Sequence, residues 1–339
     1  MDENPPPRGR LKAAWTLVIL APLCAELTFT AVAVPLTWLA LPLLIPMYGA
    51  GVLLIREAVV RVGGGWPSLA ALGLAYELAE DGIGLQALTS PNIYDTADWG
   101  LRVLGFNTTY WESQIGIHVV FSVMIPVMLI DMLFPRHRGR PYLHTGGLVG
   151  VGVAAVLGVA GLRFGIAATQ DPGYQAPLPF LGGVVLAIAI LAVLALPGRT
   201  PSPASSKPAP APVLVGLVAG VATAGFLGLL MPAGLRPGGP VFGDSVPLPI
   251  PMAAAMAVAI AAGWLFWRWT AAQDWGDQHQ IWLTGGVLVG HTAFMMPNAP
   301  FAGLAAGTAT IAFEVIALLL LARHIRRRTP EVHSGATLG

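Results

Sequence analysis

The sequence has few charged residues, and this scarcity decides the class of protein. Only 10% of its 339 residues are Asp, Glu, Lys or Arg, whereas 55% are apolar, and the mean hydropathy is +0.70. Soluble domains carry roughly a quarter charged residues. Apolar runs long enough to cross a bilayer follow one another almost without pause, which excludes a soluble fold. The composition therefore predicts an all-α, polytopic transmembrane helix bundle.

Cysteine and extended basic stretches are also scarce. Cys24 is the only cysteine, which excludes a disulfide framework and a cysteine-based metal site. Arginine outnumbers lysine sixteen to two, but the arginines lie in short clusters between apolar runs. No basic stripe with interleaved aromatic residues occurs, so we expect no nucleic-acid partner. The expected partners are the lipid bilayer and a membrane-embedded peptide or small-molecule substrate, with the oligomeric state left open.

Ten apolar runs are close to the roughly twenty residues that a helix needs to cross the hydrocarbon. Their expected bounds are 13–34, 37–60, 66–88, 113–134, 144–166, 178–197, 213–233, 249–270, 281–297 and 301–322. Arginine and lysine are concentrated in alternate connections, beginning with Arg8, Arg10 and Lys12. The positive-inside rule then predicts a multi-pass protein of the cell membrane with both termini in the cytoplasm.

A stretch rich in Pro, Ser and Ala divides the chain, because such a composition cannot bury a core. The predicted organisation is six spans in 1–197, a mobile cytoplasmic linker at 198–212, four spans in 213–325 and a basic, then disordered tail at 326–339. The longest outer connection, 89–112, is instead rich in aromatic and acidic residues. Two interpretations stay open for it, an anchor at the headgroup level or a cap over an outward-facing cavity.

Ionisable residues inside the spans are the candidate functional residues. Each costs on the order of 3 kcal/mol to insert and normally faces the interior of the bundle. Glu26, Glu80, Asp81, His118 and His291 come from four predicted spans. With a rise of about 1.5 Å per helical residue, they fall at a similar depth in the outer half of the membrane. We therefore expect them to meet in one interior pocket.

Three functions fit such a pocket. His118, His291 and Glu26 are enough to hold Zn²⁺ with a position open for water, and Glu80, assisted by Asp81, then serves as the general base of a hydrolase. The same groups without a metal suit a proton- or cation-coupled secondary transporter. In the third interpretation the protein is a membrane scaffold, and these groups only form hydrogen bonds between helices.

Other ionisable residues in the spans have simpler expected roles. Arg56 and Glu57 lie near the inner end of their span, where long side chains reach the interface, so we expect a solvated or paired arrangement. Glu314, in the last span, is expected to be a lone protonated or bridged carboxyl group. Glu77 lies one turn before Asp81 on the same helix face.

The acidic pair Glu80-Asp81 and the two histidines on later spans resemble the CPBP (Abi, Rce1-like) family of intramembrane metal-dependent proteases. That family carries Glu-Glu-x-x-x-Arg, then Phe-x-x-x-His, then His-x-x-x-Asn or Asp, each on its own helix. The resemblance implies an intramembrane protease in which both histidines bind the metal. The sequence departs from the motifs where the Arg, Phe and Asn positions hold Leu85, Gln114 and Met295.

Overall fold

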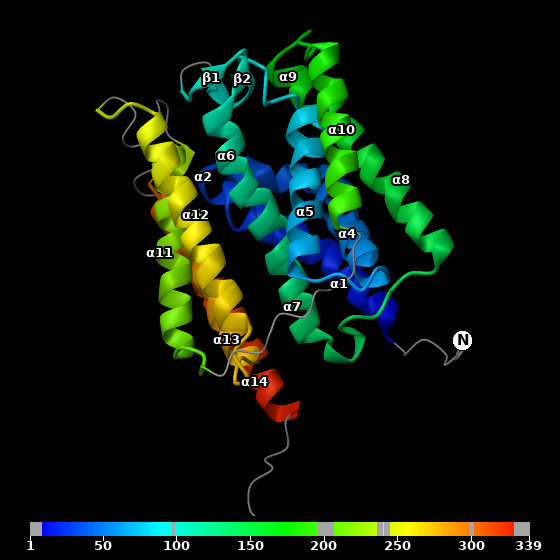
Figure 1. Cartoon of the computed structure of the whole chain (residues 1–339), viewed down its shortest axis with the longest axis vertical. Coiled ribbons are helices and arrows are strands. Elements are labelled where there is room, and N and C mark those ends of the chain that lie inside the picture. Colours follow the sequence, from blue (N-terminus) through cyan, green and yellow to red (C-terminus); the bar gives the residue numbers. More distant parts are fainter. Residues whose placement is uncertain are drawn as a thin grey trace, which may run out of the picture.

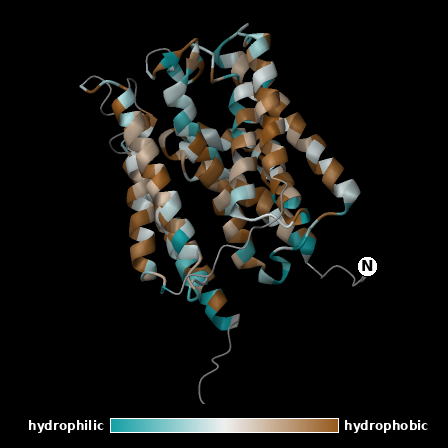
Figure 2. Ribbon diagram, viewed as in Figure 1, coloured by the Kyte–Doolittle hydropathy of each residue, from teal (hydrophilic) through white to brown (hydrophobic). Residues whose placement is uncertain are grey.

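The computed structural model describes residues 9–96, 99–195, 207–235, 240, 245–297 and 302–328. These residues form a bundle of long helices that run side by side (Figure 1). Apolar residues dominate the middle of the bundle, and hydrophilic ones gather toward its two ends (Figure 2). The chain is therefore an all-α bundle suited to a membrane.

The helices divide into a larger N-terminal group and a smaller C-terminal group. The first comprises α1 (Arg10–Pro22), α2 (Thr30–Ala33), α3 (Leu41–Leu44), α4 (Gly51–Arg61), α5 (Trp66–Glu77), α6 (Thr108–Gly116), α7 (Ile125–Leu133), α8 (Thr145–Leu162), α9 (Ala168–Gln170) and α10 (Leu178–Ala195). The second comprises α11 (Pro212–Leu230), α12 (Pro249–Thr270), α13 (Asp277–Met295) and α14 (Ala302–Arg328). Strands β1 (Arg102–Val103) and β2 (Phe106–Asn107) form an antiparallel hairpin.

Short 3₁₀ and π-helical segments lie between or at the ends of these α-helices. The 3₁₀ turns are Pro35–Ala40, Ile93–Asp95, Pro135–His137 and Ala233–Leu235. The π-helical segments are Leu23–Leu27, Ile45–Ala50, Leu78–Gly84, Ile117–Met124 and Arg163–Ala167. π turns are rare and occur mostly at functional sites. The five in the described part of the chain therefore direct attention to the side chains that they carry.

Seven helical segments of the described chain are long and apolar enough to cross a membrane. They are Pro35–Arg61, Thr108–Leu133, Thr145–Gln170, Leu178–Ala195, Pro212–Leu230, Pro249–Thr270 and Gly303–Arg327. The other three predicted spans are also helical, at 10–27, 66–84 and 277–295. The count of ten spans stays a prediction. The start of α1 and the end of α14 lie at the same end of the bundle (Figure 1), while their cytoplasmic location also stays a prediction.

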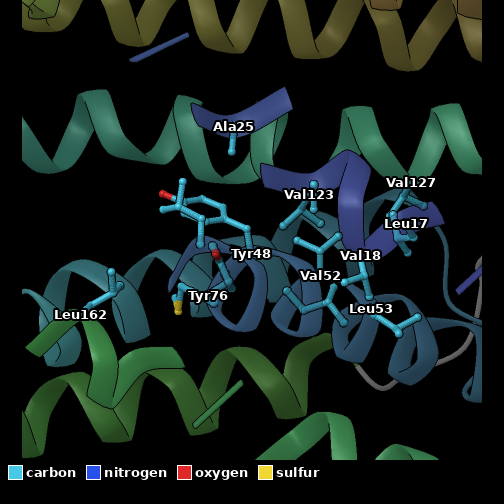
Figure 3. Close-up of a cluster of buried hydrophobic side chains, with 14 of the residues drawn as sticks. Leu17, Val18, Ala25, Tyr48, Val52, Leu53, Tyr76, Val123, Val127 and Leu162 are labelled. Atoms are coloured by element: carbon cyan, nitrogen blue, oxygen red, sulfur yellow. The ribbon is translucent and has the colours of Figure 1, made fainter. Parts of the chain in front are cut away.

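Two apolar cores hold the bundle together. In the first, Leu17 of α1, Val52 of α4 and Val127 of α7 pack together, and Tyr48 and Tyr76 approach each other beside them (Figure 3). The second core joins α11, α13 and α14 to α7 and to the segment after α1. The stretch from α1 to α2 belongs to both cores. It therefore connects the two groups of helices.

Helices α11 and α13 cross closely because glycines face each other at the crossing. A Cβ atom on Gly286 would collide with the carbonyl oxygen of Gly216. One on Gly290 would lie 2.8 Å from the carbonyl oxygen of Gly220. Small residues allow this approach, which compensates for the weak hydrophobic driving force between helices in lipid. This pair forms the framework of the C-terminal group.

Several boundaries differ from those predicted. Helix α6 begins at Thr108 rather than 113, because the Asn107 side chain accepts a hydrogen bond from the Tyr110 backbone N–H at 3.0 Å and so caps the helix. Helix α14 continues to Arg328, past the predicted start of the tail at 326. Within the predicted linker and tail, residues 198–206 and 329–339 lie outside the described residues.

Candidate functional site

A cavity of about 350 Å³ lies between the two groups of helices, on the side of the β-hairpin. Its polar wall comes from the N-terminal group and includes Glu26, Tyr48, Glu80, Asp81 and His118. Each of these residues belongs to a π-helical segment: Glu26 to the first, Tyr48 to the second, the acidic pair to the third and His118 to the fourth. The π turns therefore carry every central group of the site.

The 89–112 connection forms part of the cavity wall. Tyr94, Asp95, Trp99 and Tyr110 all line the cavity. Tyr94 and Asp95 have positive φ angles of 57° and 53°, a conformation that costs free energy in non-glycine residues and that clusters at functional sites. The connection therefore caps one side of the cavity, whereas its outward location stays a prediction.

His118 is held between two neighbouring carboxyl groups. Its Nδ1 lies 3.3 Å from Glu80 Oε2, and its Nε2 lies 3.4 Å from Asp81 Oδ2. Ser122 Oγ lies 3.4 Å from the same Nδ1. All three charged side chains are buried. Because each ring nitrogen faces a carboxyl oxygen, an imidazolium pairs with both carboxylates at once, but neither contact has the geometry of a hydrogen bond.

Tyr48 joins two carboxyl groups from different helices. Its hydroxyl oxygen lies 2.7 Å from Glu26 Oε1 and 2.6 Å from Glu80 Oε1. A phenol has one hydrogen and can donate it to only one of these oxygens. The second contact needs a hydrogen from a carboxyl group, so at least one of Glu26 and Glu80 is protonated. The three groups form a chain of hydrogen bonds that ends beside His118.

Two more aromatic side chains hold the acidic residues. The Tyr110 hydroxyl donates to Asp81 Oδ1 at 3.1 Å, and the Trp111 indole N–H donates to Glu77 Oε2 at 3.2 Å. Glu77 is fully buried but is not among the residues that line the cavity. Asp81 therefore belongs to the site with Glu80, whereas Glu77 supports the helix behind them.

His291 lies in a different polar environment. Its Nε2 is 3.2 Å from the carbonyl oxygen of Cys24 and 3.5 Å from Thr28 Oγ, and its Nδ1 is 3.1 Å from Thr292 Oγ. The ring stacks on Phe29 with a centroid distance of 5.3 Å. It is not among the cavity-lining residues. The expected meeting of all five candidates is therefore found for four of them.

The residues do not fit the zinc site predicted from His118, His291 and Glu26. Both nitrogens of His118 face carboxyl oxygens, and those of His291 face a carbonyl and hydroxyl groups. Within the described part of the chain, no group of three or more His, Cys, Asp or Glu residues is placed to hold a metal ion. The predicted zinc has no ligand set here.

Sequence reasoning missed Tyr48 and assigned Tyr110 no chemical role. Tyr48 lies in an apolar run, where its ring looks like ordinary core. A usable signal was present, because a tyrosine hydroxyl buried in a membrane span must find a hydrogen-bond partner. The buried carboxyl groups of the neighbouring spans are the strongest acceptors available.

A family model described as an uncharacterized membrane protein family matches residues 16–330. The chain belongs to this family. The match spans both sides of the predicted linker, so the N-terminal and C-terminal helices are parts of one family unit. No curated protein and no solved structure matches the chain. Membership confirms an integral membrane protein, and the comparisons do not support the resemblance to the CPBP family.

Proposed function

We propose that this protein is a metal-independent hydrolase that acts within the membrane on a substrate bound in the cavity. One observation carries the proposal: the His118 imidazole lies between the carboxyl groups of Glu80 and Asp81 at the cavity wall. A carboxylate held beside an imidazolium can take a proton from water as general base and then give it to a leaving group as general acid. This pairing needs no ligand set for a metal ion.

The reaction follows from the positions of the two groups. Glu80, as carboxylate, takes a proton from a water molecule whose oxygen attacks the carbonyl carbon of an ester or amide. Glu80 then gives this proton to the leaving oxygen or nitrogen as the bond to carbon breaks. The His118 imidazolium stays paired with Glu80 and Asp81 and stabilises the carboxylate form of Glu80. Glu80 thereby regains its starting state.

Asp81 and Tyr48 act as positioning residues. Asp81 fixes the orientation of the imidazole and stabilises its positive charge, and the Tyr110 hydroxyl holds Asp81 in place. Tyr48 binds the Glu80 oxygen that faces away from His118 and so fixes the carboxyl plane. General acid–base catalysis by positioned groups contributes about 10²–10⁴ in rate. Substitution of Asp81 or Tyr48 should therefore lower the hydrolysis rate by a factor in that range.

The test uses ¹⁸O-labelled water, because every hydrolysis incorporates an oxygen atom of water into a product. Protein in lipid nanodiscs is incubated with native membrane extract in H₂¹⁸O, and mass spectrometry identifies products that gain one ¹⁸O in a new carboxyl group. We expect labelled products from the wild type and a loss of about 10²-fold or more in Glu80→Gln and His118→Gln. Labelling that is equal in the wild type and both variants would refute the proposal.

His291→Gln separates this proposal from the zinc hydrolase. Because His291 makes no contact with Glu80 or His118 in the described structure, labelling should persist in this variant, scaled to its folded fraction. Strong chelation should likewise leave the wild-type rate unchanged. If His291→Gln folds but is inactive, and chelation also stops the reaction, the metal-dependent mechanism is correct instead.

A second candidate function, proton-coupled cation transport, is favoured by the Tyr48 bridge. The shared hydrogens between Glu26, Tyr48 and Glu80 are a store of protons that a bound cation could displace. In proteoliposomes, a transporter would take up organic cations in response to an imposed pH gradient, and Tyr48→Phe would weaken this response. Hydrolytic labelling without such uptake would exclude transport.

A further inference from the structure

The cavity has an excess of negative groups. Its lining contains four carboxyl groups, Glu26, Glu80, Asp81 and Asp95, and His118 is the single basic side chain among the described lining residues. The Tyr48 bridge accounts for one proton on the Glu26 and Glu80 pair. Up to three carboxylates then face one imidazolium. A positively charged ligand would complete this charge balance.

Two buried oxygens at the cavity wall lack hydrogen bonds. Glu80 Oε2 and Asp81 Oδ2 make none within the described structure, and only the ion-pair contacts to His118 address them. Their residues are 3% and 1% exposed. Buried carboxylate oxygens are costly to leave unpaired. A ligand with positive charge is the partner that lowers this cost.

Aromatic rings stand next to these carboxyl groups. The rings of Tyr94 and Tyr110 stack with centroids 6.3 Å apart, and Trp99 lies 6.1 Å from Tyr110. All three residues line the cavity. Aromatic faces attract ammonium groups, and quaternary ammonium ligands are bound in this way. The cap and the acidic pair together therefore select an organic cation over a hydrated metal ion.

The wall contributed by the C-terminal helices has a different chemistry. Met231, Pro232, Leu235 and Met295 line the cavity there, and all are apolar. Ile117 adds a further apolar side chain from the N-terminal group. An apolar wall facing an acidic and aromatic one fits a ligand with a cationic end and a hydrocarbon part.

We propose that the cavity binds an amphiphilic organic cation, with its ammonium group between the acidic pair and the cap and its alkyl group against the Met231 and Met295 wall. The claim that this cation is the substrate class rests on the proposed hydrolase function. Binding of the cation is measured without hydrolysis, so an experiment can refute the cation site or the hydrolase function separately.

The test measures binding of small probes by calorimetry to protein in nanodiscs, with empty nanodiscs as the blank. The probes are hexyltrimethylammonium, tetramethylammonium and hexanoate, none of which can be hydrolysed. We expect hexyltrimethylammonium to bind at least about tenfold more tightly than tetramethylammonium, because the alkyl chain is buried. Hexanoate should not bind. Equal binding of hexanoate and hexyltrimethylammonium, or no binding of the latter at about 10 mM, overturns the proposal.

A matched pair of variants locates the binding. Asp95→Asn removes a cavity carboxylate outside the acid–base pair and should weaken hexyltrimethylammonium by roughly tenfold. Asp277→Asn neutralises a residue outside the cavity lining, in a half-exposed ion pair with Arg138, and should leave binding unchanged. An equal effect of both variants would contradict the assigned site. Binding without any labelled hydrolysis product would refute the hydrolase and keep the cation site.

Discussion

Two clusters of buried charged residues in the described structure differ in how their charge is satisfied. Near the connection between α7 and α8, Arg56 and Glu57 are 1% and 0% exposed. Glu57 accepts hydrogen bonds from the backbone N–H groups of Tyr142 at 2.6 Å and Leu143 at 3.2 Å. It also pairs with Arg56 at 3.4 Å and with Arg61 at 3.3 Å. Four donors therefore surround one carboxylate.

Arg56 is held through its two terminal nitrogens, whereas its Nε makes no hydrogen bond within the described structure. Arg56 donates to the carbonyl oxygens of His137 and Arg140, and its guanidinium carbon lies 3.5 Å from the centre of the Tyr142 ring. No residue of this group lines the large cavity. At the cavity, by contrast, Glu80 Oε2 and Asp81 Oδ2 have no hydrogen-bond donor within the described structure. Burial of charge alone therefore does not mark a functional site, whereas a shortage of donors beside a cavity does.

Replacing one carboxyl group by an amide in each cluster gives the sharpest test of the difference between the two clusters. Glu57→Gln should lower the free energy of unfolding by about 3 kcal/mol or more. It removes the negative charge 3.4 Å from the buried Arg56 guanidinium, which among the described acidic residues then keeps only the 3.6 Å contact to Asp131. Glu80→Gln should change it by less than about 1 kcal/mol, because the amide oxygen still accepts from Tyr48 and the repulsion from Asp81 is relieved. Equilibrium unfolding in mixed micelles of dodecyl maltoside and SDS measures both.

The matched pair controls for the loss of a carboxylate as such. The contrast is broken if Glu80→Gln is as destabilising as Glu57→Gln. The cavity cluster would then be a structural ion-pair network like that of Arg56, and the hydrolase proposal would lose its physical basis.

Sequence patterns predicted the membrane class and most helices correctly because long apolar runs are easy to recognise in a sequence. The same reasoning placed Glu26, Glu80, Asp81 and His118 together, since ionisable residues at a similar depth normally face the interior of the bundle. Of the solvated and paired arrangements expected for Arg56 and Glu57, the structure has the paired one, and the 135–143 connection buries it. No local sequence pattern encodes that long-range contact.

The π-helical segments and the position of His291 could not be read from the sequence. A π turn shifts the face on which later side chains lie, so helical spacing misplaces them. His291 was expected at the cavity on depth alone. Depth does not determine the side of a helix, and His291 faces the Thr28 segment instead.

The His291 region supplies a test of intermediate size. The Thr292 hydroxyl lies 2.7 Å from the carbonyl oxygen of Thr28, 2.9 Å from Glu314 Oε1 and 3.1 Å from His291 Nδ1. Thr292→Val removes the hydroxyl group that contacts all three atoms and leaves buried polar atoms unpaired. The free energy of unfolding should therefore fall by about 1–3 kcal/mol. Binding of hexyltrimethylammonium should stay within about twofold once corrected for the folded fraction. A selective loss of binding in a fully folded variant would make this region part of the site.

The smallest expected effect concerns the link between the cap and the end of α9, where Asp171 accepts hydrogen bonds from Ser90 Oγ at 2.6 Å and Asn92 Nδ2 at 2.9 Å. Burial alone would raise the pKa of Asp171, but these hydrogen bonds outweigh it and hold the pKa below its usual value. A lowered pKa in the folded state stabilises the protein above the unfolded value of about 3.9, and this contribution is lost as the pH falls through the folded value.

Thermal unfolding of wild type and Asp171→Asn should therefore converge as the pH is lowered below about 4, with the wild type more stable at neutral pH. Ser90→Ala should show the same convergence with a smaller difference, because it removes one of the two side-chain donors. A constant difference between wild type and Asp171→Asn across this range would show that Asp171 holds the cap through shape rather than charge. The cap would then be an anchored loop whose position over the cavity does not depend on proton binding at Asp171.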